Sequence, residues 1–131
     1  MHESHIAGNF DFEAGRRLLA EGETVDAIRS LLASVDLEPG NVETYIVLFQ
    51  AYQSAWEESG DPMVLDQMRK VALAGLKRGP DERQRSFLAD GLDRTEEFLI
   101  EEQRASAADE AASAALTPEP AKGPRKLPLI D

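Results

Sequence analysis

The side chains of this sequence that could do chemistry are two histidines and several pairs of carboxylates. His2 and His5 flank Glu3 near the start of the chain, and imidazole and carboxylate groups are common zinc ligands. Two histidines near a chain end lack the fixed positions that a structural or catalytic metal site needs. We therefore expect no bound metal.

The carboxylate pairs are neighbours in the sequence, at Glu57-Glu58, Glu96-Glu97 and Glu101-Glu102. Adjacent residues on a helix point about 100° apart, so these pairs indicate solvated faces rather than a general acid and base. No candidate base has a nucleophile and an orienting partner at a suitable spacing, and no glycine-rich phosphate loop follows a strand. The chain also has no cysteine, which removes thiolate chemistry. The prediction is a protein without enzymatic activity and without a cofactor.

The composition indicates which partners the chain can bind. Its 131 residues suffice for one domain, and its net charge is −11. Phosphates are neutralised by clustered Lys and Arg, so this acidity argues against nucleic acid and against anionic membrane surfaces. It suits a basic protein or peptide partner, or it serves solubility alone.

The hydropathy pattern concerns membranes and location. No window approaches the roughly 20 consecutive apolar residues of a membrane span, so we expect no membrane insertion. The first residues lack the basic start and apolar block of a signal peptide. We expect a cytoplasmic location.

The elements that position these residues are predicted to be five helices, because apolar residues recur at helical spacing between turn signals. The predicted helices run from about Phe10 to Glu21, from a cap near Thr24 to just before Pro39-Gly40, from the cap Asn41 to Gly60, from the cap Asp61 and Pro62 to Gly79-Pro80, and from about Asp81 to Arg104.

Three regions follow from this pattern. Residues 1–8 are predicted to be a flexible N-terminus, and residues 9–104 form the helical domain. Residues 105–131 are rich in alanine and proline, and repeated prolines prevent regular helix or central strand. We expect a disordered tail that ends in a short apolar segment.

A pattern also repeats along the chain. Asp11-x2-Ala14-Gly15-x2-Leu18 is followed 34 residues later by Tyr45-x2-Leu48-Phe49-x2-Tyr52, and Ala27-x3-Leu31 and Pro39 lie between them. A period of this length is typical of stacked helix-turn-helix units, which bury their apolar faces against each other. Such units usually bind other proteins.

These residues resemble the tetratricopeptide repeat family, whose pattern is Trp-x2-Leu-Gly-x2-Tyr, then Ala-x3-Phe, then Pro. The matches are Gly15, Ala27 and Pro39 in the first unit and Tyr45, Leu48 and Tyr52 in the second. The departures are Asp11 at an aromatic position, Phe49 at a small one, and a second unit lengthened between Tyr52 and Met68. The resemblance covers about residues 8–100. It implies an all-α fold of antiparallel α-hairpin repeats, about two units, with a C-terminal capping helix and a disordered tail.

The resemblance also implies a partner surface, because the first helix of each unit lines the inner face of such arrays. Apolar anchors with a few polar groups suit an extended or helical peptide. The alternative is that Phe12 and Ile46 pack against a neighbouring element or the tail. The partner-binding residues implied on these two helices are Phe12, Arg16, Leu19, Ile46, Gln50 and Gln53.

The C-terminal segment is a second candidate surface. Leu127, Leu129 and Ile130 follow Arg125-Lys126 after a proline-rich stretch. Disordered segments with such ends often order on binding, so these residues are candidates for docking on a partner. The alternatives are that the tail occupies the groove of its own chain, or that it binds nothing.

Together these features predict a non-enzymatic adaptor or scaffold that binds a protein segment through a helical surface, assisted by its tail. The alternative is a repeat-free helical bundle that acts as a subunit or assembly factor of a larger complex. Because two units have little core of their own, self-association is also expected.

Overall fold

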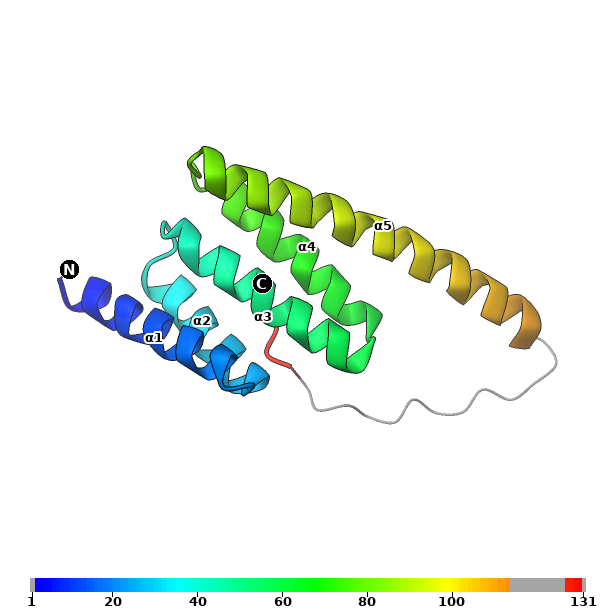
Figure 1. Cartoon of the computed structure of the whole chain (residues 1–131), viewed down its shortest axis with the longest axis horizontal. Coiled ribbons are helices and arrows are strands. Elements are labelled where there is room, and N and C mark those ends of the chain that lie inside the picture. The colour runs from blue at the N-terminus through cyan, green and yellow to red at the C-terminus, as the bar shows by residue number, and fades with distance from the viewer. Residues whose placement is uncertain (1, 114–126, 131) are drawn as a thin grey trace.

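The computed structural model describes residues 2–113 and 127–130 (Figure 1). This part of the chain contains five helices and no strand, so the predicted all-α class is confirmed. The helices are α1 (His2–Ala20), α2 (Thr24–Leu37), α3 (Val42–Ser59), α4 (Pro62–Leu76) and α5 (Glu82–Ser113).

The helices form antiparallel hairpins. Each helix packs mainly on the one that precedes or follows it in the chain, so that α1 pairs with α2, α3 with α4, and α5 closes the C-terminal side. Within the described residues, α2 and α4 both pack against α3 and not against each other. The central helix α3 therefore separates them and forms the floor between them.

The core is centred on α3. Tyr45, Leu48, Phe49 and Tyr52 are buried there, against apolar residues of α2 and α4 such as Ile28 and Leu65. Burial of several large side chains of this kind, each contributing about 1.5–3 kcal/mol, is the main source of stability for such a helix array.

Close approach of α1 and α2 depends on Gly15. A Cβ at Gly15 would stand 2.6 Å from Leu31 Cγ and 3.3 Å from the carbonyl oxygen of Ala27. The lack of a side chain therefore lets the two helices meet at this point, which is consistent with the α-hairpin that the resemblance implies.

Local signals explain most helix ends. Asn41 Oδ1 accepts a hydrogen bond from the Glu43 amide (3.2 Å), and Asp61 Oδ1 accepts one from the Met63 amide (3.0 Å). Gly60 ends α3 in the left-handed conformation at φ 64°, where glycine has no Cβ penalty. These three predicted caps are confirmed.

Thr24 is not the cap that its residue type predicts. It is the first residue of α2 and is buried, while Glu23 holds the cap position without a side-chain bond. The turn before it explains the shift. The Glu23 amide donates to the Leu18 carbonyl (2.9 Å) and the Gly22 amide to the Leu19 carbonyl (3.1 Å), which is the closure that follows a left-handed glycine.

Two helices are longer than predicted. The first begins at His2 rather than near Phe10, and the fifth continues to Ser113 rather than Arg104. Alanine has the highest helix propensity of all residues, so the alanine-rich stretch after Arg104 continues the helix. The predicted disorder of residues 114–126 and 131 lies outside the described residues. No helix in the described part combines the length and the apolar character that crossing a membrane requires.

Candidate functional site

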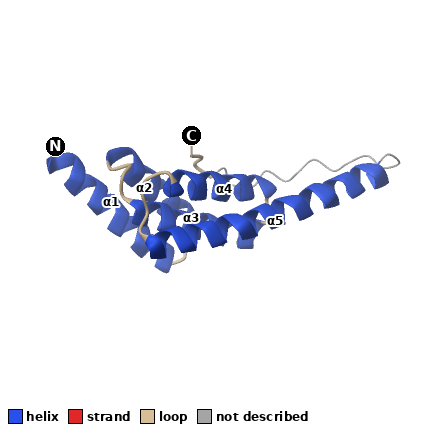
Figure 2. Cartoon of the chain, turned by 90° about the horizontal axis from the view of Figure 1, so that it is seen from above, coloured by secondary structure: helices blue, strands red, loops and turns tan. Residues whose placement is uncertain are grey.

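The C-terminal segment Leu127–Ile130 packs on the helical bundle of its own chain. The side chains of Leu127 and Ile130 are half-buried against the main core. Figure 2 shows the segment on the side of the bundle where α2 and α4 run. The segment therefore lies in the groove between α2 and α4, above α3, and we call this groove the α2–α4 groove.

Two buried side chains bind the backbone of this segment. The hydroxyl of Tyr52 in α3 donates a hydrogen bond to the carbonyl oxygen of Pro128 (2.8 Å). The amide of Ile130 donates one to Oε1 of Gln67 in α4 (2.8 Å). Tyr52 is 0% and Gln67 3% exposed, and buried polar groups without a partner cost about 1–3 kcal/mol each. Each of these two buried side chains therefore has its hydrogen-bond partner in the segment.

The burial of Tyr52 also changes its titration. Loss of water contact raises the pKa of the Tyr52 hydroxyl well above its ordinary value, because the phenolate is poorly solvated in the interior. A tyrosine is protonated at neutral pH in any case, so the raised pKa extends to alkaline pH the range in which the hydroxyl donates to the Pro128 carbonyl oxygen.

An open pocket of about 660 Å³ continues beside Leu127 and Leu129. Its walls come from the α1–α2 turn, the first turn of α2, the last turns of α3 and the first turns of α4. The lining includes the apolar side chains Val25, Ala55, Met63 and Val64 and the acidic side chains Glu23, Asp26, Glu58 and Asp61. The segment therefore fills only part of the groove.

The three partner-binding residues predicted on the first helix do not form one exposed surface. Phe12 is 9% exposed and belongs to the main core, and Leu19 is half-buried against that core. Arg16 is exposed, with its guanidinium carbon 5.7 Å from the Phe12 ring centre and its Nη1 3.7 Å from Glu13. Phe12 is therefore a core residue of the fold.

On the third helix the pattern is similar. Ile46 is 5% exposed and packs with Val42 and Leu88, which joins α3 to α5. Gln50 is exposed and Gln53 half-buried. An apolar anchor for a partner has to be exposed, and Phe12 and Ile46 are not. The roles of Arg16, Leu19, Gln50 and Gln53 in partner binding stay predictions.

The predicted tail residues do come together at one place. Leu127 and Ile130 face the bundle, while Leu129 is 54% exposed. The second option derived from the sequence placed the tail in the groove lined by the first helices; the segment does pack on its own chain, but at a different groove. The groove lies between the second helices of the two hairpins, and none of the six residues predicted on α1 and α3 lines the pocket.

Sequence reasoning missed Gln67 and the groove around it. The signal was present, because Gln67 interrupts the apolar stripe of α4 between Val64 and Val71. A polar side chain on a buried face requires a hydrogen-bonding partner. The partner could not be identified from local pattern, since it lies 63 positions away in the chain.

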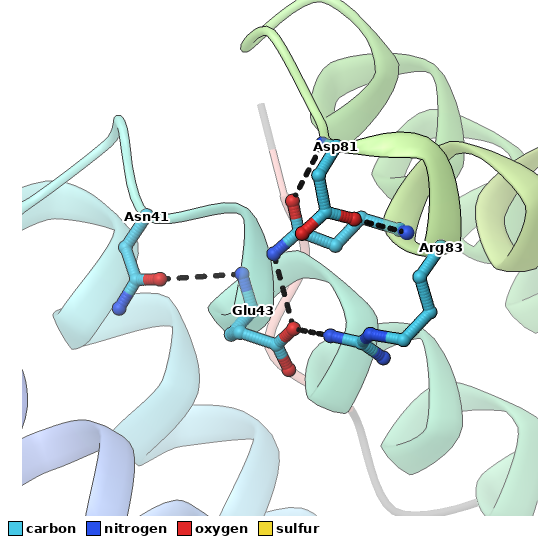
Figure 3. Close-up of polar contacts among 5 residues, drawn as sticks. Asn41, Glu43, Asp81 and Arg83 are labelled. Carbon is cyan, nitrogen blue, oxygen red and sulfur yellow. Dashed lines mark hydrogen bonds and ion pairs between the residues drawn. The ribbon is translucent and has the colours of Figure 1, made fainter.

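A second polar cluster joins the starts of α3 and α5 (Figure 3). Glu43 Oε1 accepts hydrogen bonds from Arg83 and from Gln84 Nε2, the latter at 3.0 Å. Asp81 and Gln84 exchange backbone–side-chain bonds of 2.8 and 2.9 Å, which is a capping box at the start of α5. These contacts orient α5, and no nucleophile is among them.

Trp56 fills a structural position as well. It is half-buried, and its ring centre lies 4.5 Å from that of Phe98 in α5. The contact helps to close the junction of α3 and α5.

The described part of the chain has no cluster of three or more His, Cys, Asp or Glu side chains that could hold a metal ion. The side chains of His2 and His5 lie outside the residues whose side chains are described. Comparison with protein-family models, with curated proteins and with solved structures gave no match for the chain.

Proposed function

We propose that this chain is a non-enzymatic, tetratricopeptide-like adaptor that binds an extended peptide segment in the α2–α4 groove. The observation that carries the proposal is the seating of Leu127–Ile130, whose backbone pairs with Tyr52 and Gln67. A groove that holds an extended segment of its own chain has the donors, acceptors and apolar contacts that a segment of another protein would use.

The mode of recognition follows from these contacts. Tyr52 supplies one donor and Gln67 one acceptor to the peptide backbone, and these bonds set the register without reading side chains. Specificity comes from the apolar contacts at Leu127 and Ile130, which are spaced three residues apart. Proline between them suits this geometry, because its carbonyl accepts a bond and its fixed φ lowers the entropy cost of an extended conformation.

The chain's own segment acts as a competitor for the partner. An attached ligand on a short linker is present at an effective concentration on the order of millimolar. A partner peptide must therefore displace the segment, and the adaptor binds weakly until it does. This gives the tail a role in setting the threshold for partner binding.

The tetratricopeptide-like part of the proposal is supported by two features. The two hairpins lie side by side with α3 in the centre, and Gly15 meets Leu31 and Ala27 at the contact of α1 with α2. Both features belong to the pattern that the resemblance implies. The groove that we propose for the partner, however, lies between the second helices of the hairpins.

A peptide titration tests the proposal. A fluorescently labelled peptide of residues 125–131 is titrated with the full chain and with the full-length double variant Leu127→Ser/Ile130→Ser, which we call the opened variant. Fluorescence polarisation should show binding by the opened variant at least about tenfold tighter than by the unmodified chain, because the internal competitor is weakened.

The matched control is Leu129→Ser. It removes the same kind of side chain from the same segment, but Leu129 is 54% exposed, so the segment should stay bound and the peptide affinity should remain that of the unmodified chain. Peptide affinity of the opened variant equal to that of this control would refute the proposal. Circular dichroism verifies that all three proteins keep their helical content.

A further inference from the structure

We infer that the partner segment carries one or two Lys or Arg residues directly before its apolar-proline-apolar-apolar stretch, and that an acidic rim of the pocket recognises them. This inference rests on the proposed function, because it names the chemistry of the peptide that the α2–α4 groove accepts. The acidic rim consists of Glu23, Asp26, Glu58 and Asp61.

The rim is one-sided in charge. Its four carboxylates come from the α1–α2 turn, α2, the end of α3 and the cap of α4, and no Lys or Arg lines the pocket among the described residues. Asp61 is occupied as a helix cap and Asp26 pairs with Arg29 at 3.2 Å. Glu23 and Glu58 are exposed and form no ion pair with another described residue. These two carboxylates are therefore available to a ligand.

The helix ends do not reverse this charge. α2 and α4 begin at the pocket and α1 and α3 end there, so the helix dipoles add about +0.5 twice and about −0.5 twice. These contributions roughly cancel, which leaves the charge of the four carboxylates. The pocket consequently favours a cation over the carboxylate or phosphate that a helix N-terminus alone would attract.

The walls suit the stem of a long basic side chain. Val25, Ala55 and Val64 are half-buried or buried and line the same pocket as the exposed Glu23 and Glu58, and the pocket stays open beside Leu127 and Leu129. Lys and Arg place their aliphatic stems on apolar surface while the charged head stays at the water boundary. A basic residue that binds here could place its stem against these apolar side chains and its charged head near the exposed Glu23 and Glu58.

The sequence of the chain itself gives the order of these groups. Arg125 and Lys126 directly precede Leu127, so the segment that occupies the groove is the end of a basic-basic-apolar-proline-apolar-apolar sequence. The groove and its rim match that sequence in both apolar character and charge. A partner that displaces the segment should carry the same combination.

The expected size of the effect is modest. Exposed ion pairs change an affinity by about twofold to fivefold each, and salt screens them. The basic pair should therefore raise peptide affinity by about fivefold to twentyfold at low salt and by much less near 1 M salt. The apolar and backbone contacts should account for the remaining affinity, which is insensitive to salt.

The test uses the opened variant in full length and three labelled peptides. They are residues 125–131 unchanged, the same peptide with Arg125→Ala/Lys126→Ala, and the same peptide with Leu127→Ser/Ile130→Ser. We expect the alanine peptide to bind about fivefold to twentyfold more weakly than the unchanged peptide at low salt. The serine peptide should not bind.

A protein-side test adds Glu23→Gln/Glu58→Gln to the opened variant, with Glu96→Gln/Glu97→Gln on α5 as the matched control. Neutralising the rim should lower the affinity for the unchanged peptide severalfold and leave the affinity for the alanine peptide unaltered. The α5 control should change neither affinity. Equal binding of the unchanged and alanine peptides, or no effect of the rim variant, would overturn the inference while the proposed function stands. Failure of every peptide to bind would overturn the proposed function as well.

Discussion

The hydroxyl of Tyr52 donates a hydrogen bond to the carbonyl oxygen of Pro128 at 2.8 Å, across 76 positions of the sequence. The bond joins the most buried part of α3 to the C-terminal segment. Together with the bond from the Ile130 amide to Gln67, it holds the segment at two backbone atoms that lie two residues apart. The segment is thereby fixed in register on the bundle.

Removing this hydroxyl should loosen the segment. Tyr52→Phe keeps the ring in the core and loses one hydrogen bond, worth about 0.5–1.5 kcal/mol, so the detached population should rise about twofold to tenfold. The rate at which carboxypeptidase releases Ile130, measured by mass spectrometry, is proportional to the detached population when the segment rebinds faster than the protease cleaves it.

The matched control for this change is Tyr45→Phe. Tyr45 donates to the Pro39 carbonyl oxygen at 2.9 Å, away from the segment, so the same chemical change there should not alter the release of Ile130. If Ile130 were released at the same rate from the unmodified chain and from Tyr52→Phe, the Tyr52–Pro128 hydrogen bond would not hold the segment.

The same residue predicts a dependence on alkaline pH. Burial raises the pKa of Tyr52 above the value of about 10 that a tyrosine has in the unfolded chain, so its contribution is fully present below pH 10. Above that pH the unfolded state ionises first, and the free energy of unfolding should fall by up to about 1.4 kcal/mol per pH unit. Urea unfolding between pH 9 and 11 should show a smaller loss for Tyr52→Phe. Parallel losses in both proteins would exclude this linkage.

The junction of α3, α4 and α5 should not tolerate a side chain at Gly75. A Cβ there would stand 2.8 Å from Leu88 Cδ1 and 3.0 Å from Tyr45 Cβ. Gly75→Val should lower the free energy of unfolding by about 1–3 kcal/mol through overpacking. Gly40 has open space around it, so Gly40→Val should change stability by less than about 0.5 kcal/mol in the same urea titration. A neutral Gly75→Val would contradict the close helix contact.

The polar cluster at the start of α5 allows a comparison of two contacts. Asp81→Ala removes a helix cap and should cost about 0.5–2 kcal/mol. Arg83→Ala removes an exposed ion pair to Glu43 and should cost less than about 1 kcal/mol. Thermal unfolding followed by circular dichroism ranks the two variants, and a larger loss for Arg83→Ala would reverse our assignment of their roles.

Much of the fold is local in origin, and that part was predictable. Asn41, Gly60 and Asp61 act through bonds or backbone angles within a few residues, and each lies where its residue type predicts. The spacing of Gly15 and Ala27 likewise indicated the contact between α1 and α2. Five helices in antiparallel hairpins follow from such signals.

The candidate site depends on contacts that pattern alone does not contain. Phe12 and Ile46 have the spacing of a surface stripe, but their burial depends on which helices lie next to them. The pairing of Gln67 with Ile130 depends on where the chain end lies after folding. Apolar character made Leu127 and Ile130 candidates for docking, but it could not decide between a partner, the chain itself and no contact at all.

Amide hydrogen exchange at Ile130, measured by NMR on the full chain, tests most directly whether the C-terminal segment occupies the α2–α4 groove. We expect this amide to exchange severalfold more slowly than in a free peptide of residues 125–131. Leu127→Ser should abolish the protection, and Leu129→Ser should preserve it. Exchange of the Ile130 amide at the free-peptide rate in the unmodified chain would show that the segment does not occupy the groove.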